Sequence, residues 1–273
     1  MSQKFAGSAL LVLVGAALLS CRGQGTQAAN SGGDGLRVKA VLPSGFALWK
    51  SLSLARPKDG IDGRLELLVD ARIQSPGGPA KGVLPSCNPC APLDESPVPQ
   101  WCTTLAPSSL ARAKVRLVAH SGEVIALREL ECPLAQITQE TLRADTGQAY
   151  AVTVDLSTEE GAYTGPLTRF AEVVNGKLEW LTATDSQTKE TREVELTSTG
   201  KSAWTLSPHK GGTDILVAAG DIDSTSPPSE GGAPQVTLLI RYHFDKNRWV
   251  RVSRTEPGFW ESGNEFPERK RFP

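Results

Sequence analysis

The stretch TRFAEVVNGKLEWLTAT, residues 168–184, decides the fold class. Apolar and polar residues alternate on both sides of Asn175-Gly176, as they do in strands that bury one face. Asn-Gly is the strongest short hairpin signal, because both residues tolerate the positive φ that a tight two-residue turn needs. The stretch therefore predicts an antiparallel β-hairpin.

Apolar and polar residues alternate in the same way along much of the chain on both sides of this hairpin. Three further hairpins are expected, turning at Ser121-Gly122 within residues 111–132, at Thr199-Gly200 within 192–207 and at 245–247 within 235–255. Single strands are expected within 36–42, 46–55, 63–75 and 213–223. The sequence therefore predicts an all-β protein.

One segment, residues 133–147, favours a helix instead. Pro133 fits the first turn of a helix, and Gly147 can end one. We therefore predict two β-sandwich-like or meander-like subdomains joined by a short helix. The first subdomain would span residues 36–135 and contain a loop held by disulfides. The second would span residues 136–273 and end in an aromatic C-terminal segment.

The N-terminus has the three-part pattern of a secretory signal peptide, which we place at residues 1–20. Lys4 supplies the positive start, residues 5–19 are apolar or small, and Ser20-Cys21 follow. A membrane-spanning helix needs about 20 apolar residues, and this run is shorter. The next stretch, residues 21–35, has almost no apolar side chains and predicts a flexible tether.

Residues Leu18-Leu19-Ser20-Cys21 resemble the lipobox of bacterial lipoproteins. The resemblance covers about the first 22 residues. It implies that the chain is cut before Cys21, that the Cys21 thiol carries a diacylglyceryl group and that the new amine is acylated. These acyl chains on Cys21 would anchor the protein to a membrane. Arg22 stands where these lipoproteins carry the inner-membrane retention residue Asp, which favours the outer membrane.

Four cysteines remain if Cys21 is lipidated. The spacing Cys87-Asn-Pro-Cys90 is shared with dithiol redox sites, but the prolines that follow it exclude the helix such a site needs. A zinc site would need a second close pair, and Cys102 and Cys132 stand alone. In an exported protein these four cysteines predict two structural disulfides, with three connectivities possible.

Composition and motifs exclude several function classes. The formal net charge is −1, which argues against nucleic-acid binding. His120, His209 and His243 lack the spacing of metal ligands, and no Gly-x-Ser-x-Gly nucleophile motif occurs. The sequence therefore assigns no catalytic residue, no metal ligand and no cofactor.

The C-terminal stretch carries aromatic residues among glycines, prolines and charges: Phe259, Trp260, Phe266 and Phe272. A disordered tail would hold few aromatics. They predict either an irregular segment packed on the sheet or a site that docks a partner, since aromatics favour interfaces.

Two functions fit these observations. The first is a non-catalytic lipoprotein of the outer membrane, on its periplasmic or cell-surface face, that binds an envelope protein or a glycan. The second is an extracytoplasmic hydrolase of envelope polysaccharide, because two carboxylates on distant loops leave little local signature. A pair of carboxyl groups with one raised pKa would favour the hydrolase.

Overall fold

A computed structural model describes residues 40–54, 62–73, 87, 107–143, 147–156, 165–174, 176–223 and 233–273. Nearly all the regular structure is β, which confirms the predicted fold class. The described part of the chain contains no α-helix and only two 3-10 turns, η2 (Pro107–Ser109) and η3 (Arg269–Arg271). None of its helices has the length and apolar character needed to cross a membrane.

The first half of the chain forms an antiparallel sheet of four strands in sequence order. These are β1 (Phe46–Ser53), β2 (Gly63–Asp70), β3 (Lys114–Ala119) and β4 (Val124–Glu129). The hairpin of β3 and β4 turns at Gly122, whose φ of 92° is accessible to glycine. This confirms the turn predicted at Ser121-Gly122.

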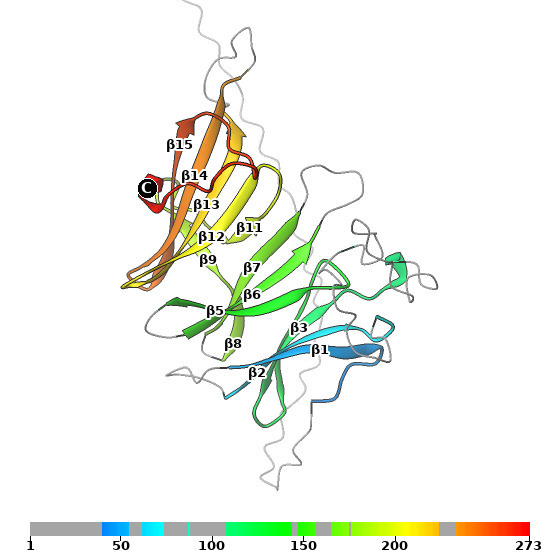
Figure 1. The fold of residues 1–273 in the computed structure, drawn as a ribbon. Coiled ribbons are helices and arrows are strands. Elements are labelled where there is room, and N and C mark those ends of the chain that lie inside the picture. Colours follow the sequence, from blue (N-terminus) through cyan, green and yellow to red (C-terminus); the bar gives the residue numbers. More distant parts are fainter. Residues whose placement is uncertain are drawn as a thin grey trace, which may run out of the picture. The chain divides into compact units, whose positions relative to one another are not determined.

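The second half forms an eleven-stranded sheet that curls into a nearly closed barrel (Figure 1). One long path runs β10-β9-β15-β14-β13-β5-β6-β7-β11, with β12 on β13 and β8 on β7. Its strands are β5 (Gln136–Arg143), β6 (Gly147–Asp155), β7 (Pro166–Val174), β8 (Lys177–Trp180), β9 (Thr182–Asp185), β10 (Thr191–Glu193), β11 (Glu195–Thr197), β12 (Ser202–His209), β13 (Gly212–Ile222), β14 (Gln235–Asp245) and β15 (Arg248–Pro257).

Two predicted hairpins of the second half are confirmed. Strands β7 and β8 pair antiparallel up to Val174 and Lys177, and Gly176 in their turn has a φ of 74°. Strands β14 and β15 are joined at Lys246 and Asn247, with φ values of 46° and 65°. Positive φ at both central residues is the hairpin geometry that matches the twist of the strands.

The turn at Thr199-Gly200 does not join paired strands as predicted. An isolated bridge links Thr199 to Ser202, but β11 pairs with β7 and β12 pairs with β13. The two strands diverge because each has a longer-range partner. This turn therefore joins the partner of β7 to the partner of β13.

The helix predicted at residues 133–147 is wrong. Residues 136–143 form β5, which pairs antiparallel with β6. Ile137 and Leu142 are both buried, but in different hydrophobic clusters, because residues five positions apart on a strand face opposite sides of the sheet. Pairing with β6 along one edge, together with burial on both faces, outweighs the weak helix signals of Pro133 and Gly147.

Three hydrophobic cores hold the described fold together. The first core lies where the two sheets meet, with Leu65 and Leu117 from the four-stranded sheet and Ile137 and Val152 from the larger one. The second core belongs to the barrel-like sheet and includes Phe170, Ile215 and Trp249. The third core lies beneath the C-terminal segment. The two halves divide between β4 and β5, yet contacts place Arg37–Pro273 in one unit.

A buried carboxylate at the end of β2 gives the fold a dependence on pH. Asp70 is 3% exposed and accepts hydrogen bonds from the Arg72 guanidinium and from the backbone N–H groups of Arg72 and Ala111. The Arg72 side chain is the main cause that lowers the pKa of Asp70 from 3.8 to about 2, although burial opposes it. The ionised form is therefore the one that stabilises the fold.

We expect Asp70→Asn to lower the free energy of unfolding by about 2 kcal/mol at neutral pH. Because the folded-state pKa is depressed, this contribution is present above the unfolded value of 3.8 and is lost as the pH falls toward about 2. Urea unfolding of both proteins across this range measures the difference. Glu129→Gln, which removes an exposed partner of Lys114, is the control. A difference that stays constant with pH would contradict the assignment.

Candidate functional site

A disulfide joins Cys87 to Cys132 across 45 positions of the chain. Cys132 is fully buried in the first core, and the N–H of Cys87 donates to the carbonyl of Asp155 at the end of β6. The bond therefore ties residue 87 to the core beside the start of β5. Cys90 and Cys102, predicted to be bridged as well, lie outside the described residues, as does Cys21.

The C-terminal segment, residues 258–273, packs along the outer face of β12, β13 and β14 (Figure 1). Trp260 and Phe272 are buried there, Phe266 packs between them, and Phe259 lies under the ammonium of Lys201. A Cβ at Gly220 would lie 2.4 Å from the Trp260 carbonyl, so the segment approaches β13 closely. This is the packing expected if the aromatics belong to an irregular segment packed on the sheet. Docking of a partner by these aromatics stays a prediction.

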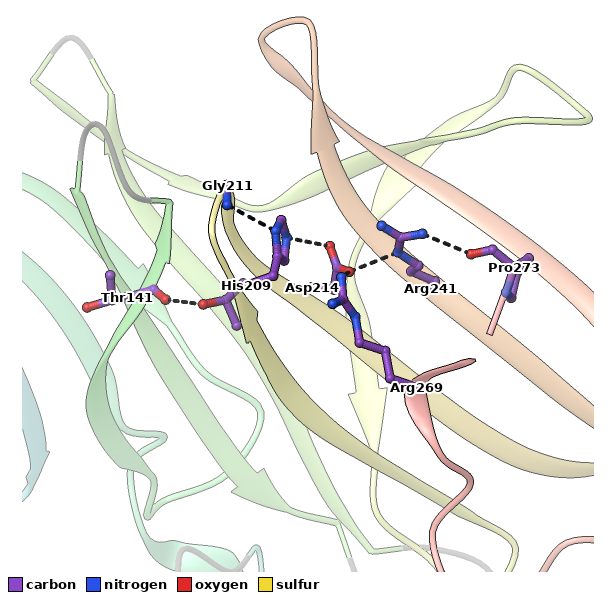
Figure 2. Close-up of polar contacts among 8 residues, drawn as sticks. Thr141, His209, Gly211, Asp214, Arg241, Arg269 and Pro273 are labelled. Carbon is purple, nitrogen blue, oxygen red and sulfur yellow. Dashed lines mark hydrogen bonds and ion pairs between the residues drawn. The ribbon is translucent and has the colours of Figure 1, made fainter. Parts of the chain in front are cut away.

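The centre of this packed region is a buried carboxylate on β13, Asp214, which has no exposed surface. Figure 2 shows its carboxylate between β12, β14 and the C-terminal segment. Asp214 Oδ2 accepts from Arg241 Nε at 2.9 Å and from Arg269 Nη2 at 2.7 Å, and Oδ1 lies 3.1 Å from His209 Nε2. Arg241 also donates to the carbonyl of Pro273.

The electrostatics of this group stabilise the charged carboxylate. Burial alone would raise the pKa of Asp214, but Arg269, Arg241 and His209 outweigh it and lower the pKa. Arg269 belongs to the C-terminal segment and Arg241 to β14. Asp214 therefore fastens the C-terminal segment to the sheet by charge as well as by apolar packing.

The His209–Asp214 pair is not arranged as a catalytic dyad. Gly211 donates its backbone N–H to His209 Nδ1 at 3.1 Å, while Nε2 faces Asp214 (Figure 2). A general base needs a free ring nitrogen to take a proton from a nucleophile. Both nitrogens of His209 are occupied within the protein, so this histidine orders the turn between β12 and β13.

A cavity of about 280 Å³ lies at the β9–β10 hairpin beside β15. It is lined by Ala183, Asp185, Thr188, Glu190, Arg192 and Arg251. Strand β9 pairs with β10 on one side and in parallel with β15 on the other, which brings Asp185 opposite Arg251. Only one lining side chain is apolar, so the cavity is a polar site.

The carboxylate of Asp185 organises this polar pocket. Its Oδ1 accepts the backbone N–H groups of Gln187 and Thr188, and its Oδ2 pairs with Arg251. The bond from Thr188 is the main cause that lowers the pKa of Asp185 to about 2. Arg192 pairs with Glu190 at 2.5 Å on the more exposed side. The pocket therefore holds two guanidinium–carboxylate pairs.

Glu172 on β7 is the described carboxyl group whose pKa is raised. Burial is the main cause, with a further contribution from Glu179, its partner across the β7–β8 ladder, while Arg143 opposes both. Two like charges directly opposite each other cost stability in a sheet. The pair is the feature of the described residues that the hydrolase hypothesis would use.

Sequence reasoning missed the Asp214 group and the polar pocket. His209 was singled out only as a histidine without metal-ligand spacing. The run of Asp185, Thr188, Glu190 and Arg192 was a visible signal of a polar turn, but Arg251 is 66 positions away from Asp185. In the described residues no three His, Cys, Asp or Glu side chains are grouped to hold a metal.

The comparisons with known proteins give no relative from which a role could be read. No family of known proteins matches the chain, and neither a curated protein nor a solved structure is similar to it. The functional argument therefore depends on this chain's own residues.

Proposed function

We propose that this protein is a lipid-anchored protein of the bacterial outer membrane whose role is binding rather than catalysis. The Cys87–Cys132 disulfide carries the proposal, because structural disulfides persist in oxidising compartments and are rare in the cytosol. The lipobox resemblance at Cys21 supports the same location and supplies the anchor. The tether predicted at residues 21–35 would allow the domain to contact another envelope component.

The finer assignments follow from this location. Cys90 and Cys102 would form the second disulfide, since Cys87 and Cys132 are already joined. Acyl chains on Cys21 would hold the membrane, and the domain would bind an envelope protein or a glycan. We propose no nucleic-acid partner, because the formal net charge is −1.

Mass spectrometry of protein taken from its native cells tests the anchor. We expect an N-terminal peptide that begins at Cys21 and carries acyl chains, and we expect Cys87 and Cys132 to resist alkylation until a reductant is added. The Cys21→Ser protein is the control and should lack the acyl mass. An intact, unmodified N-terminus at Met1 together with freely alkylated thiols would overturn the proposal.

The hydrolase alternative has one observation in its favour, the raised pKa of Glu172 opposite Glu179. Glycoside hydrolysis uses a pair of carboxyl groups, one of which is a general acid with a raised pKa. The same preparation, incubated with envelope polysaccharide, distinguishes the two roles. Release of reducing ends that Glu172→Gln abolishes would favour the hydrolase, and stable association without release favours binding.

A further inference from the structure

We propose that the polar pocket at the β9–β10 hairpin binds one neutral sugar ring of a glycan. This inference depends on the proposed binding role and names its ligand class and its site. The cavity volume, about 280 Å³, lies just below the range for small-molecule pockets, about 300–1,000 Å³. The ligand would therefore be small, or one unit of a longer chain that enters from solvent.

The charge of the pocket favours a neutral ligand. Asp185 and Glu190 contribute two carboxylates, and Arg192 and Arg251 contribute two guanidinium groups. Each carboxylate is already paired with a guanidinium, so the formal charges of the lining cancel. An anion would meet the two carboxylates, and a cation would meet the two guanidinium groups.

The hydrogen-bonding chemistry favours hydroxyl groups. A hydroxyl both donates and accepts, so neighbouring hydroxyls on a ring can donate to a carboxylate and accept from the guanidinium beside it. Such bonds to charged groups are stronger than those between neutral groups. Thr188 adds a hydroxyl of its own, and the Ala183 methyl leaves room beside the pairs.

The Asp185–Arg251 side of the pocket is held in place before a ligand binds. Asp185 is fixed by two backbone N–H groups and by Arg251, which also donates to Ser253 at 3.3 Å. The N–H of Ser186 donates to the carbonyl of Arg251, which ties the hairpin turn to β15. Groups that are already ordered lose less conformational entropy on binding.

A peptide fits this pocket less well than a sugar. Peptides bind to sheets mainly by adding a strand at a free edge or by placing apolar side chains in apolar pockets. Both edges of β9 at the pocket are paired, to β10 and to β15. For an apolar side chain the lining offers only the methyl groups of Ala183 and Thr188 and the stems of the two arginines.

Calorimetric titration of the full acylated chain tests the proposal. The protein is kept in lauryldimethylamine oxide, a detergent without a sugar headgroup, and titrated with maltotetraose, cellotetraose and chitotetraose. We expect at least one of these neutral oligosaccharides to bind. Arg192→Met and Glu190→Gln, which each remove half of the exposed pair, should weaken that binding about tenfold.

Glu193→Gln is the matched control. Glu193 follows Arg192 on β10, is exposed, and does not line the pocket. It should bind the oligosaccharide as the unchanged protein does. The proposal would be overturned if all three variants bound as tightly as the unchanged protein, or if none of the three oligosaccharides bound. It would also be overturned if tetragalacturonate or tetra-alanine bound more tightly than any neutral sugar. The N-terminal mass of the same preparation reports separately on the anchor.

Discussion

Replacing Cys87 and Cys132 together by alanine is expected to lower the free energy of unfolding by about 4 kcal/mol. The disulfide joins positions 45 residues apart, so it removes much of the freedom of a long loop in the unfolded chain. Cys132 is also fully buried in the first core, so its loss removes packing there. Urea unfolding followed by tryptophan fluorescence measures the change.

Reduction of the unchanged protein separates the cross-link from the packing. We expect a reductant to lower its stability by nearly as much as the double substitution does. Reductant added to the Cys87→Ala, Cys132→Ala protein then reports on the second pair, Cys90 and Cys102. A reduced protein that unfolds at the same urea concentration as the oxidised one would show that the bond contributes nothing.

Asp214→Asn is expected to lower the free energy of unfolding by about 3 kcal/mol, because it leaves Arg241 and Arg269 beside a buried neutral group. The substitution should loosen the C-terminal segment as well as destabilise the whole fold. Arg269 no longer holds the C-terminal segment by charge, so limited proteolysis should cut within residues 258–273 sooner. Urea unfolding and the proteolysis rate together measure the effect.

Glu256→Gln is the control for this result. Glu256 pairs with Arg271 of the same segment but is far more exposed than Asp214, so its loss should cost less than about 1 kcal/mol. A double-mutant cycle of Asp214→Asn with Arg269→Met isolates their interaction. If the two substitutions are additive, the ion pair does not fasten the segment and the aromatic packing alone does.

Local signals were enough to predict many of the strands and three of the four hairpin turns. They did not predict β6, and residues 40–42, expected within a strand at 36–42, lie outside any strand. Gly122 and Gly176 have the positive φ that their turns require, and Lys246 and Asn247 form the third turn as expected. Alternation along residues 213–223 correctly predicted β13. These features depend on neighbours in the chain, which a single sequence contains.

Features that depend on distant partners could not be read in the same way. Residues 136–143 have few apolar side chains, and only their pairing with β6 makes them a strand. Closure of the larger sheet depends on contacts such as that of Gly212 with Arg143. The pocket depends on the parallel pairing of Asp185 with Arg251, and no pattern in either segment specifies the other.

The same limit applies to the aromatic C-terminus. Its composition indicated order, but two outcomes remained open because the surface that would cover Trp260 and Phe272 was not known. That surface is Leu216 and Ala218 of β13 with Leu239 of β14. Three positions on two hairpin strands thus form the apolar surface on which the C-terminal segment packs.

The first core has a consequence for how this chain could have diversified. Leu65 and Leu117 from one sheet and Ile137 and Val152 from the other share one apolar interior. Neither sheet alone could cover that interior, so a gene encoding only one of them would specify an incomplete protein. Recombination at the β4–β5 junction would separate halves that need each other.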